Sequence, residues 1–556
     1  MDGSAAVTTG PGLDAILGAL DPEQRAAATL PDGPAQIIAP AGSGKTTTMV
    51  ARLAVLLARG VAPERICVVT FNRDAAQDLK ARVERRLASV VPRAREIEIR
   101  TLHALARQVA LDAGERREIV ADRLPLLRAA RRRVAREDEP PPPEAADLDT
   151  WLSAWRIEGR PPPEQARATI AAYEDLLRAR GLLDFDDLVV GAADRLERDP
   201  RLRLRWQARF AHVCVDEFQD VDAAQLRLVR LLAAPEDNLF VVGDDDQTIY
   251  AWRLADVRRI LRFSADYPDA RRVMLATNYR CPTAVVAASA RLVAVNRERF
   301  AKPIRAAPDL ADDPRAIEAW PSGDAEWPDH AARLAADATR RGRQICFLAR
   351  TRAELVPVFL ALVRAGVPHR PNVPPIVEAA PVTTLVDAAR ATPPSAPPFR
   401  ALLGLRAGHG WRRGDPGADH LSDEDQAALD ALLGWSVGFR RLGAFVGAFD
   451  AARARIHALQ SDDAVVELAT VHASKGREWE TVVLVGFEEG RIPNRRSIED
   501  ADDSERAVEE ERRLAYVALT RATRHLVLAF DPARPSPFLA EMGFALRPAS
   551  ASRRLS

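Results

Sequence analysis

The stretch that decides the fold is residues 37–49, Ile-Ile-Ala-Pro-Ala-Gly-Ser-Gly-Lys-Thr-Thr-Thr-Met. Its apolar start predicts a short buried strand, Gly42 and Gly44 predict a tight loop, and a helix begins at Lys45. This order is typical of a phosphate-binding loop, because glycines let backbone N–H groups wrap phosphate oxygens at the start of a helix. Lys45 would reach the terminal phosphates, and the Thr46 hydroxyl would be a ligand of Mg²⁺. The stretch alone also fits an unrelated nucleotide site, so the rest of the chain decides its function.

The loop departs at one position from the usual pattern G-x-x-x-x-G-K-[ST]. Ala39 stands where the first glycine is usual, and we interpret this change as harmless because the position ends the strand. The residues expected to contact the nucleotide at this loop are Ala41, Gly42, Ser43, Gly44, Lys45, Thr46 and Thr47.

Composition limits the possible functions. A chain of 556 residues is too long for one hydrophobic core, so roughly three or four domains are expected. Its 79 basic and 79 acidic residues cancel, which excludes a basic field over the whole chain, so any nucleic-acid surface must be local. Nearly all basic residues are arginine, and the lysines are Lys45, Lys80, Lys302 and Lys475. Two of these lysines, Lys45 and Lys475, stand beside glycines in predicted loops, which marks them as functional candidates.

The cysteines and the apolar runs indicate the compartment. Cys67, Cys214, Cys281 and Cys346 are scattered without a C-x-x-C pair, so a metal knot or disulfide framework is not expected. This usage fits a reducing cytoplasm. No apolar run approaches membrane-spanning length, and no basic region followed by an apolar segment opens the chain. We therefore expect a soluble cytoplasmic protein without a membrane partner.

The order of predicted elements gives the fold class. Strands at 35–39 and 66–70 each precede a helix, which predicts a parallel sheet with the phosphate loop at its carboxyl edge. Short apolar strands follow at 212–215 and 239–242, and a second α/β unit runs from about residue 278. Its expected strands are 345–348, 465–470, 481–485 and 526–529. The predicted class is α/β, with two parallel-sheet units that are each interrupted by a mainly helical insertion.

Proline-rich and arginine-rich stretches give the expected boundaries. The first unit comprises 1–103 and 184–277, with residues 1–12 as a flexible leader, and 104–183 is its helical insertion. The second unit comprises 278–372 and 463–545, around a reduced insertion at 373–462. A polar tail, 546–556, is expected to be disordered.

Two carboxylates follow the strand at 212–215, where the chain reads Asp216-Glu217-Phe218-Gln219-Asp220. Adjacent carboxylates beyond a strand, in a chain with a phosphate loop, are what Mg²⁺-dependent phosphoryl transfer needs. Asp216 would hold the metal, and Glu217 would polarise the attacking water. Asp216 by itself would equally fit an acidic helix cap, but the phosphate loop favours the catalytic interpretation.

The next strand leads into Gly243-Asp244-Asp245-Asp246-Gln247-Thr248-Ile249-Tyr250-Ala251-Trp252-Arg253. Gln247 would sense the γ-phosphate. Trp252 offers a face on which a base can stack, and Arg253 offers a phosphate contact. A lone tryptophan is more often part of a core, so the DNA-binding interpretation depends on the other motifs.

Taken in order, these windows resemble the motifs of superfamily 1 DNA helicases of the UvrD/Rep/PcrA type, and the resemblance covers both α/β units. It implies two RecA-like P-loop NTPase lobes with ATP and Mg²⁺ bound between them. Residues 20–24 resemble the segment whose glutamine, Gln24, reads adenine. Asn278-Tyr279-Arg280 resembles the motif whose tyrosine packs on the base and whose arginine meets the γ-phosphate. Residues 510–522 resemble the motif that supplies a second arginine finger, Arg521.

Other windows resemble the DNA-contacting motifs. Thr70-Phe71-Asn72 and Thr101-Leu102-His103 resemble two motifs that line the path of single-stranded DNA. Residues 470–478 resemble the motif whose histidine, His472, touches DNA and whose glutamate, Glu478, touches the ribose. Residues 184–188, Asp-Phe-Asp-Asp-Leu, resemble a further family motif. The DNA-contact candidates are Phe71, His103, Trp252, Arg253 and His472.

The resemblance implies an ATP-dependent DNA helicase or translocase that moves 3′ to 5′ on single-stranded DNA and acts at duplex junctions in repair, replication or recombination. Leu254 stands where a glycine is usual, and Arg477 and Trp479 stand where leucine and phenylalanine are usual. The insertion at 373–462 is shorter than the family's second accessory (2B) domain.

Two alternatives therefore stay open. One is a motor subunit that unwinds only with a protein partner, such as a nuclease or a defence factor. The other is a non-enzymatic scaffold derived from a helicase, which the intact set Lys45, Glu217, Gln247, Arg280 and Arg521 disfavours.

Overall fold

The chain divides into two compact units in the computed structural model, which describes residues 11–87, 91–136, 140–310, 313–321, 326–371, 376–412, 418, 421 and 423–544. Unit 1 is Met1–Tyr279 with Glu298–Ile304, and unit 2 is Arg280–Arg297 with Arg305–Ser556. The predicted tail and nearly all of the predicted leader lie outside the described residues. Among the residues described, no helix is long and apolar enough to cross a membrane.

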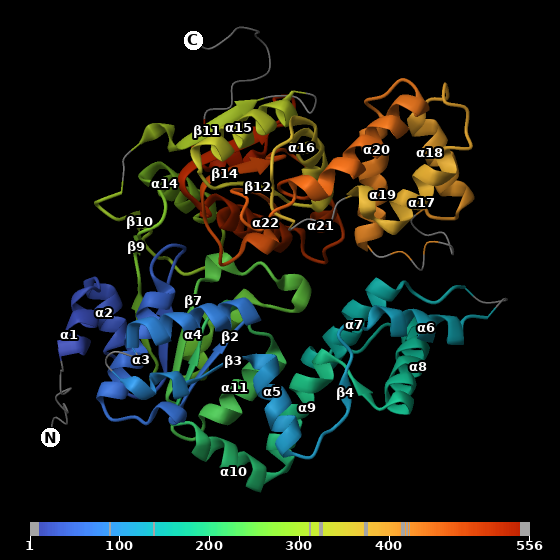
Figure 1. Cartoon of the computed structure of the whole chain (residues 1–556). Coiled ribbons are helices and arrows are strands. Elements are labelled where there is room, and N and C mark those ends of the chain that lie inside the picture. The colour runs from blue at the N-terminus through green and yellow to red at the C-terminus, as the bar shows by residue number, and fades with distance from the viewer. Residues whose placement is uncertain are drawn as a thin grey trace, which may run out of the picture. The chain divides into compact units, whose positions relative to one another are not determined.

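Unit 1 is built on a parallel sheet of six strands in the order β3-β2-β6-β7-β1-β8 (Figure 1). The strands are β1 Ala35–Ile38, β2 Ile66–Thr70, β3 Glu98–Thr101, β6 His212–Val215, β7 Leu239–Gly243 and β8 Arg271–Met274. Because the three central strands β6, β7 and β1 are neighbours, the loops that follow them meet at one edge of the sheet.

Helices cover both faces of this sheet. They are α1 Pro11–Gly18, α2 Pro22–Ala28, α3 Lys45–Ala58, α4 Arg73–Leu87, α5 Leu102–Asp112, α9 Phe185–Arg198, α10 Pro200–Arg209, α11 Ala223–Ala233, α12 Val257–Leu261 and α13 Phe263–Asp266. Successive strand residues point to opposite faces, so Ile37 joins the core with α3 and α4 while Ile38 joins the core with α5, α9 and α11. This two-sided burial explains why the central strands are continuous apolar runs.

The insertion of unit 1 has its own small core. Helices α6 Leu124–Val134, α7 Ala145–Glu158 and α8 Glu164–Arg180 pack around Leu127, Leu148 and Tyr173. Strands β4 Glu118–Ile119 and β5 Leu182–Leu183 pair in parallel where the chain leaves and re-enters this group. Helix α5, although it lies largely within the segment 104–183, packs with the sheet because Leu102, Leu105, Ala106 and Val109 recur at helical spacing.

Unit 2 is built on a parallel sheet of five strands in the order β11-β15-β14-β12-β13 (Figure 1). The strands are β11 Ile317–Pro321, β12 Ile345–Ala349, β13 Val466–Thr470, β14 Trp479–Val485 and β15 Ala522–Phe530. With the sheet of unit 1, this confirms the predicted α/β class with two parallel sheets. The short strands β9 Thr277–Asn278 and β10 Arg305–Ala306 lie near the points where the chain passes from one unit to the other.

The helices of unit 2 are α14 Thr283–Val293, α15 Trp327–Arg341, α16 Arg352–Ala365, α17 Ala380–Ala389, α18 Pro398–Gly408, α19 Asp423–Ser436, α20 Leu442–Leu459, α21 Arg495–Glu499, α22 Ser504–Leu519 and α23 Pro537–Glu541. Helices α15 to α20 share one hydrophobic core with the sheet. Helices α17 to α20 come from the segment predicted as a reduced insertion, and their apolar side chains share a cluster with α15, α16 and the sheet. Leu385 and Phe445 lie in the same cluster as Phe347 of β12.

Helix α16 begins with a capping box formed by Thr351 and Glu354, and the surroundings of Glu354 disfavour its charged form. The Thr351 N–H donates to Glu354 Oε2 at 3.0 Å. Burial raises the pKa of Glu354 to about 7, although that backbone hydrogen bond opposes the shift. The folded chain therefore keeps a proton on Glu354 in a pH range in which the unfolded chain has lost it.

We expect Glu354→Gln to stabilise the protein more at pH 8 than at pH 4.5. Between the pKa of Glu354 in the unfolded chain, about 4.3, and its pKa in the folded chain, rising pH destabilises the folded wild type. Glutamine does not titrate, so it removes this loss of stability while still completing the capping box. The check is urea unfolding of wild type and variant across this pH range. A stability difference that is constant with pH would contradict the assignment.

Candidate functional site

The loop between β1 and α3 has the backbone of a phosphate-binding loop. Gly42 and Gly44 both have positive φ angles, +70° and +82°, which a side chain would strain. Gly44 caps α3, and the Ser43 hydroxyl donates to the Pro40 carbonyl oxygen at 2.7 Å. Backbone turned this way at a helix N-terminus presents N–H groups to an anion.

Gln24 is seated against this loop. It forms a capping box with Asp21 at the start of α2, and its Nε2 donates to the Ser43 carbonyl oxygen at 2.9 Å. Only 5% of the residue is exposed. A Cβ added at Gly44 would lie 2.5 Å from Gln24 Nε2, so a side chain at residue 44 would force the glutamine to move. The adenine-reading role of Gln24 stays a prediction.

The end of unit 1 returns to the same loop. The Tyr279 N–H donates to the Gly42 carbonyl oxygen at 2.9 Å, and its hydroxyl donates to Asp21 Oδ2 at 2.6 Å. The residue remains 44% exposed, so a ring face is available for stacking. The Lys45 ammonium donates to the Ala39 carbonyl oxygen at 3.1 Å, which places it at the end of β1.

The loop after β6 carries the two adjacent carboxylates in a strained conformation. Glu217 has φ +51°, a left-handed backbone that costs a non-glycine residue on the order of 1–3 kcal/mol and is concentrated at functional sites. Its N–H donates to Asp216 Oδ1 at 3.0 Å, and its carboxylate accepts a hydrogen bond from Gln219 Nε2.

A buried glutamine joins this loop to the loop after β7. Gln219 is fully buried, and its Oε1 accepts the Asp244 N–H at 3.0 Å. Asp244 in turn accepts Gln247 Nε2 on its Oδ2 at 2.7 Å. Glu217 and Gln247, predicted separately from two motifs, therefore belong to one hydrogen-bonded network.

Unit 2 brings together three other predicted residues. Arg280 Nε donates to Glu478 Oε2 at 2.6 Å, and its Nη1 donates to the Thr520 carbonyl oxygen at 3.2 Å. Arg521 is 1% exposed and donates from Nη1 to the Arg477 carbonyl oxygen at 3.1 Å. Arg280, Glu478 and Arg521 thus lie on adjoining segments of unit 2.

Arg477 and Trp479, which stand where leucine and phenylalanine are usual, contact each other. The Arg477 guanidinium lies over the Trp479 ring, 4.9 Å from its centroid, and pairs with Glu467. Trp479 Nε1 donates to Glu467 Oε2 at 3.0 Å, and Glu467 is almost fully buried. Arg477 and Trp479 therefore form one packed cluster with a buried carboxylate. His472, in the 3₁₀ turn His472–Ser474 of unit 2, is half-buried.

A row of aromatic rings crosses the surface of unit 1. Phe71 stacks on Tyr250 with centroids 4.8 Å apart, and Tyr250 meets Trp252 edge-on at 6.2 Å. The Arg253 guanidinium lies 4.7 Å from the centroid of the Trp252 ring, and Trp252 is 62% exposed. Leu254 has φ +62°, so the leucine adopts the backbone conformation that the usual glycine would adopt freely. Tyr250 was not predicted as a site residue, and its position between Phe71 and the exposed Trp252 marks it.

His103 contacts a second aromatic residue that was not singled out from the sequence. Its ring meets the Phe185 ring edge-on with centroids 5.4 Å apart, and Phe185 is 39% exposed. Burial lowers the pKa of His103 below its ordinary value, against the opposing charge of Asp186. The signal that could have identified Phe185 is an aromatic residue between aspartates at the start of a helix.

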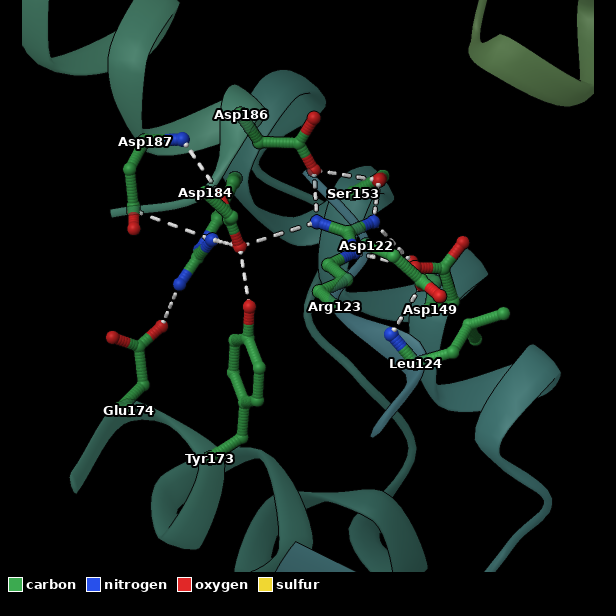
Figure 2. A network of polar contacts seen from close by, with 11 residues as sticks. Asp122, Arg123, Leu124, Asp149, Ser153, Tyr173, Glu174, Asp184, Asp186 and Asp187 are labelled. Carbon is green, nitrogen blue, oxygen red and sulfur yellow. Dashed lines mark hydrogen bonds and ion pairs between the residues drawn. The ribbon is translucent and has the colours of Figure 1, made fainter. Parts of the chain in front are cut away.

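Figure 2 shows how the aspartates around Phe185 are held. Arg123 donates to Asp186 Oδ2 at 2.5 Å, and Tyr173 of α8 donates its hydroxyl proton to Asp184 Oδ2 at 2.8 Å. Arg156 of α7 pairs with Asp184 and with Glu174. The start of α9, and with it Phe185, is therefore fixed by the helices of the insertion.

Thr46 and Asp216 carry the type of oxygen donor that Mg²⁺ prefers. Thr46 lies on the first turn of α3, and Asp216 supplies a carboxylate at the end of β6. Mg²⁺ is typically bound by one or two protein oxygens together with substrate phosphates, so a larger carboxylate cluster is not required. Within the described part of the chain, no group of three or more His, Cys, Asp or Glu side chains is arranged for a metal.

Comparison with known proteins gives consistent matches over both units. The model of the UvrD/REP helicase N-terminal domain matches residues 20–268, and that of the UvrD-like helicase C-terminal domain matches residues 451–531. The ATP-dependent DNA helicase UvrD2 of Mycobacterium tuberculosis is 31% identical over 94% of this chain and 80% of its own length. UvrD1 of the same species is 28% identical over 93% and 82%, and the putative ATP-dependent DNA helicase YjcD of Bacillus subtilis is 26% identical over 92% and 78%.

We expect Gly44→Ala to weaken ATP binding by at least about tenfold, because alanine opposes the left-handed backbone and meets Gln24. The measurement is titration with a fluorescent ATP analogue. Gly404→Ala is the matched control, since Gly404 lies in α18 with nothing within 4 Å of the added Cβ. Equal binding by the Gly44 variant and wild type would contradict the assignment of the loop.

Proposed function

This chain belongs to the UvrD/REP family of ATP-dependent DNA helicases, and from that premise we propose that Lys45, Glu217, Gln247, Arg280 and Arg521 carry out its ATP hydrolysis. The observation that supports this most directly is the network that ties Glu217 to Gln247 through Gln219 and Asp244, beside a glycine-turned phosphate loop. The network links the proposed general base to the proposed γ-phosphate sensor through hydrogen bonds.

In the proposed reaction, Lys45 and the loop N–H groups hold the β- and γ-phosphates. Glu217 accepts a proton from the water whose oxygen attacks the γ-phosphorus, while the bond to the β–γ bridging oxygen breaks and ADP leaves. Gln247 donates a hydrogen bond to the γ-phosphate or the attacking water. Arg280 and Arg521 neutralise the negative charge that develops on the transferred group. Gln24, Tyr279 and Glu478 contact the base and the ribose.

We propose Mg²⁺ as the metal, with Thr46 and Asp216 as its protein ligands. The ion would offset charge on the phosphates when bound. The hydroxyl and carboxylate oxygens at these positions are the ligand type that Mg²⁺ prefers.

The aromatic row Phe71, Tyr250 and Trp252 is the proposed platform for single-stranded DNA, with Arg253 on the backbone phosphates. Exposed ring faces stack bases of any sequence, which suits a motor that must move along DNA. His103 and Phe185 extend the platform in unit 1, and His472 is the proposed contact in unit 2. Movement from 3′ to 5′, and a role in DNA repair, replication or recombination, are proposed by analogy with the family.

A motor that depends on a protein partner is the second candidate. The observation that favours it is the small helical group α17 to α20, which shares its core with α16 rather than forming an independent domain. Strand displacement on a 3′-tailed duplex separates the two, because an autonomous helicase unwinds it alone. A partner-dependent motor would hydrolyse ATP on single-stranded DNA and leave the duplex intact until a nuclease or repair factor is added.

We expect Glu217→Gln to lower the kcat of DNA-stimulated ATP hydrolysis by roughly 10²- to 10⁴-fold with little change in ATP affinity, because only the proton acceptor is lost. Lys45→Ala should lower both. Phosphate release in the presence of single-stranded DNA is the readout, and Glu84→Gln on the exposed face of α4 is the control. Full turnover by the Glu217 variant would exclude it as the general base.

Trp252→Ala and Phe185→Ala are each expected to weaken single-stranded DNA binding by about 1–3 kcal/mol without changing its salt dependence, because no charge is removed. Arg253→Ala should lower the slope of log affinity against log salt by about 0.7. Fluorescence anisotropy at several salt concentrations measures both quantities. Phe399, a 43% exposed aromatic residue of α18, gives the control Phe399→Ala. Unchanged affinity in the Trp252 variant would remove it from the DNA platform.

A further inference from the structure

The loop after β7 contains a buried cluster of charges that the proposed reaction does not use. Lys302 has a fully buried side chain, and its ammonium contacts three consecutive aspartates. The ammonium donates hydrogen bonds to Asp244 Oδ1 at 2.8 Å and to Asp245 Oδ1, and it forms an ion pair with Asp246 Oδ2 at 2.9 Å. Three carboxylates thus surround one ammonium, which has three N–H donors.

This geometry suits the ammonium of lysine better than a guanidinium. A guanidinium is planar and presents its donors in a fixed fork, whereas an ammonium is a compact charge with three donors in a pyramid. The chain uses arginine for almost all of its basic residues, and Lys302 is one of its few lysines. The second cation of the cluster, Arg299, pairs with Asp246 alone, through contacts of 3.0 and 2.8 Å.

Lys302 acts on the same carboxylate that holds Gln247. Asp244 receives Lys302 on Oδ1 and Gln247 Nε2 on Oδ2, so the ammonium fixes the direction in which the second oxygen points. Burial by itself would raise the pKa of Asp244, but the charges of Lys302 and Lys45 outweigh it and hold that pKa below its ordinary value. Asp244 therefore stays an acceptor for both neighbours.

The same aspartate also connects to the proposed general base. Its N–H donates to Gln219 Oε1, and Gln219 Nε2 donates to Glu217. This link runs through the backbone of Asp244, whereas Lys302 and Gln247 meet on its carboxylate. Lys302 itself lies in Glu298–Ile304, the short segment by which the chain returns to unit 1 between two parts of unit 2.

We propose that Lys302 is a positioning residue for ATP hydrolysis, which orients Gln247 through Asp244. The inference rests on the proposed role of Gln247. It makes Lys302 necessary for the speed of hydrolysis and dispensable for the binding of ATP. Arg299 helps to hold the cluster together but makes no hydrogen bond to Asp244, so its variant serves as the control for the orientation of Gln247.

The test is DNA-stimulated ATP hydrolysis by the full chain, with kcat and KM measured for Lys302→Met and Arg299→Met. Loss of precise placement costs up to about 100-fold in rate, so Lys302→Met should lower kcat by about 10- to 100-fold and leave KM for ATP within about twofold. Arg299→Met removes a partly buried cation from the same cluster and should keep wild-type kcat. Equal loss of kcat in both variants would overturn the proposal, because it would show a structural effect of the cluster.

A double-mutant cycle separates positioning from general damage. In the Gln247→Ala background, Lys302→Met should slow hydrolysis by less than about threefold, because the residue on which it acts is gone. If the rate losses of the two single variants multiply in the double variant, the proposal is overturned. A normal kcat for Gln247→Ala itself would instead refute the proposed role of Gln247, which distinguishes the two failures.

Removal of one buried cation can prevent folding, so a charge-matched variant is needed. Lys302→Met combined with Asp245→Asn removes one charge of each sign and leaves Asp244 and Gln247 in place. This double variant should show the same loss of kcat at a melting temperature close to that of wild type. Wild-type kcat in this folded variant would overturn the proposal.

Discussion

The structure depends on the burial of three adjacent parallel strands in unit 1. Strands β6, β7 and β1 are neighbours in the sheet and are covered on both faces, so their carboxyl ends emerge side by side. The phosphate loop, the paired carboxylates and the Gln247 loop are the segments that follow these ends. Segments more than 170 residues apart in the chain, such as residues 45 and 217, are thereby brought to one edge of the sheet.

Much of this arrangement could be predicted from the sequence because it is locally encoded. The central strands are short apolar runs, and each site residue lies within a few residues of a strand end. Strands β3, β8 and β11 were not predicted, and all three are edge strands. Arg271 and Arg272 of β8 are exposed, so this strand lacks the apolar run that marks a buried one.

The parts of the site that sequence reasoning missed are those that depend on distant contacts. Lys302 meets aspartates more than 55 residues earlier in the chain, and nothing in its own surroundings marks it except that it is a lysine. Phe185 and Tyr250 stand out only once exposure and ring contacts are known. The sequence shows Arg477 and Trp479 only as two departures from the family pattern, whereas in the structure both contact the buried Glu467.

The orientation of Gln247 also explains why the aspartate cluster is buried in unit 1. Buried ion pairs contribute little net stability, because desolvation offsets most of their attraction, and an apolar replacement is often equally stable. An apolar side chain at residue 244 would leave Gln247 Nε2 without its carboxylate acceptor. The carboxylate of Asp244, by contrast, is held on its other oxygen by Lys302. The cluster is therefore better explained by the orientation it imposes on Gln247 than by any stability that it adds to the fold.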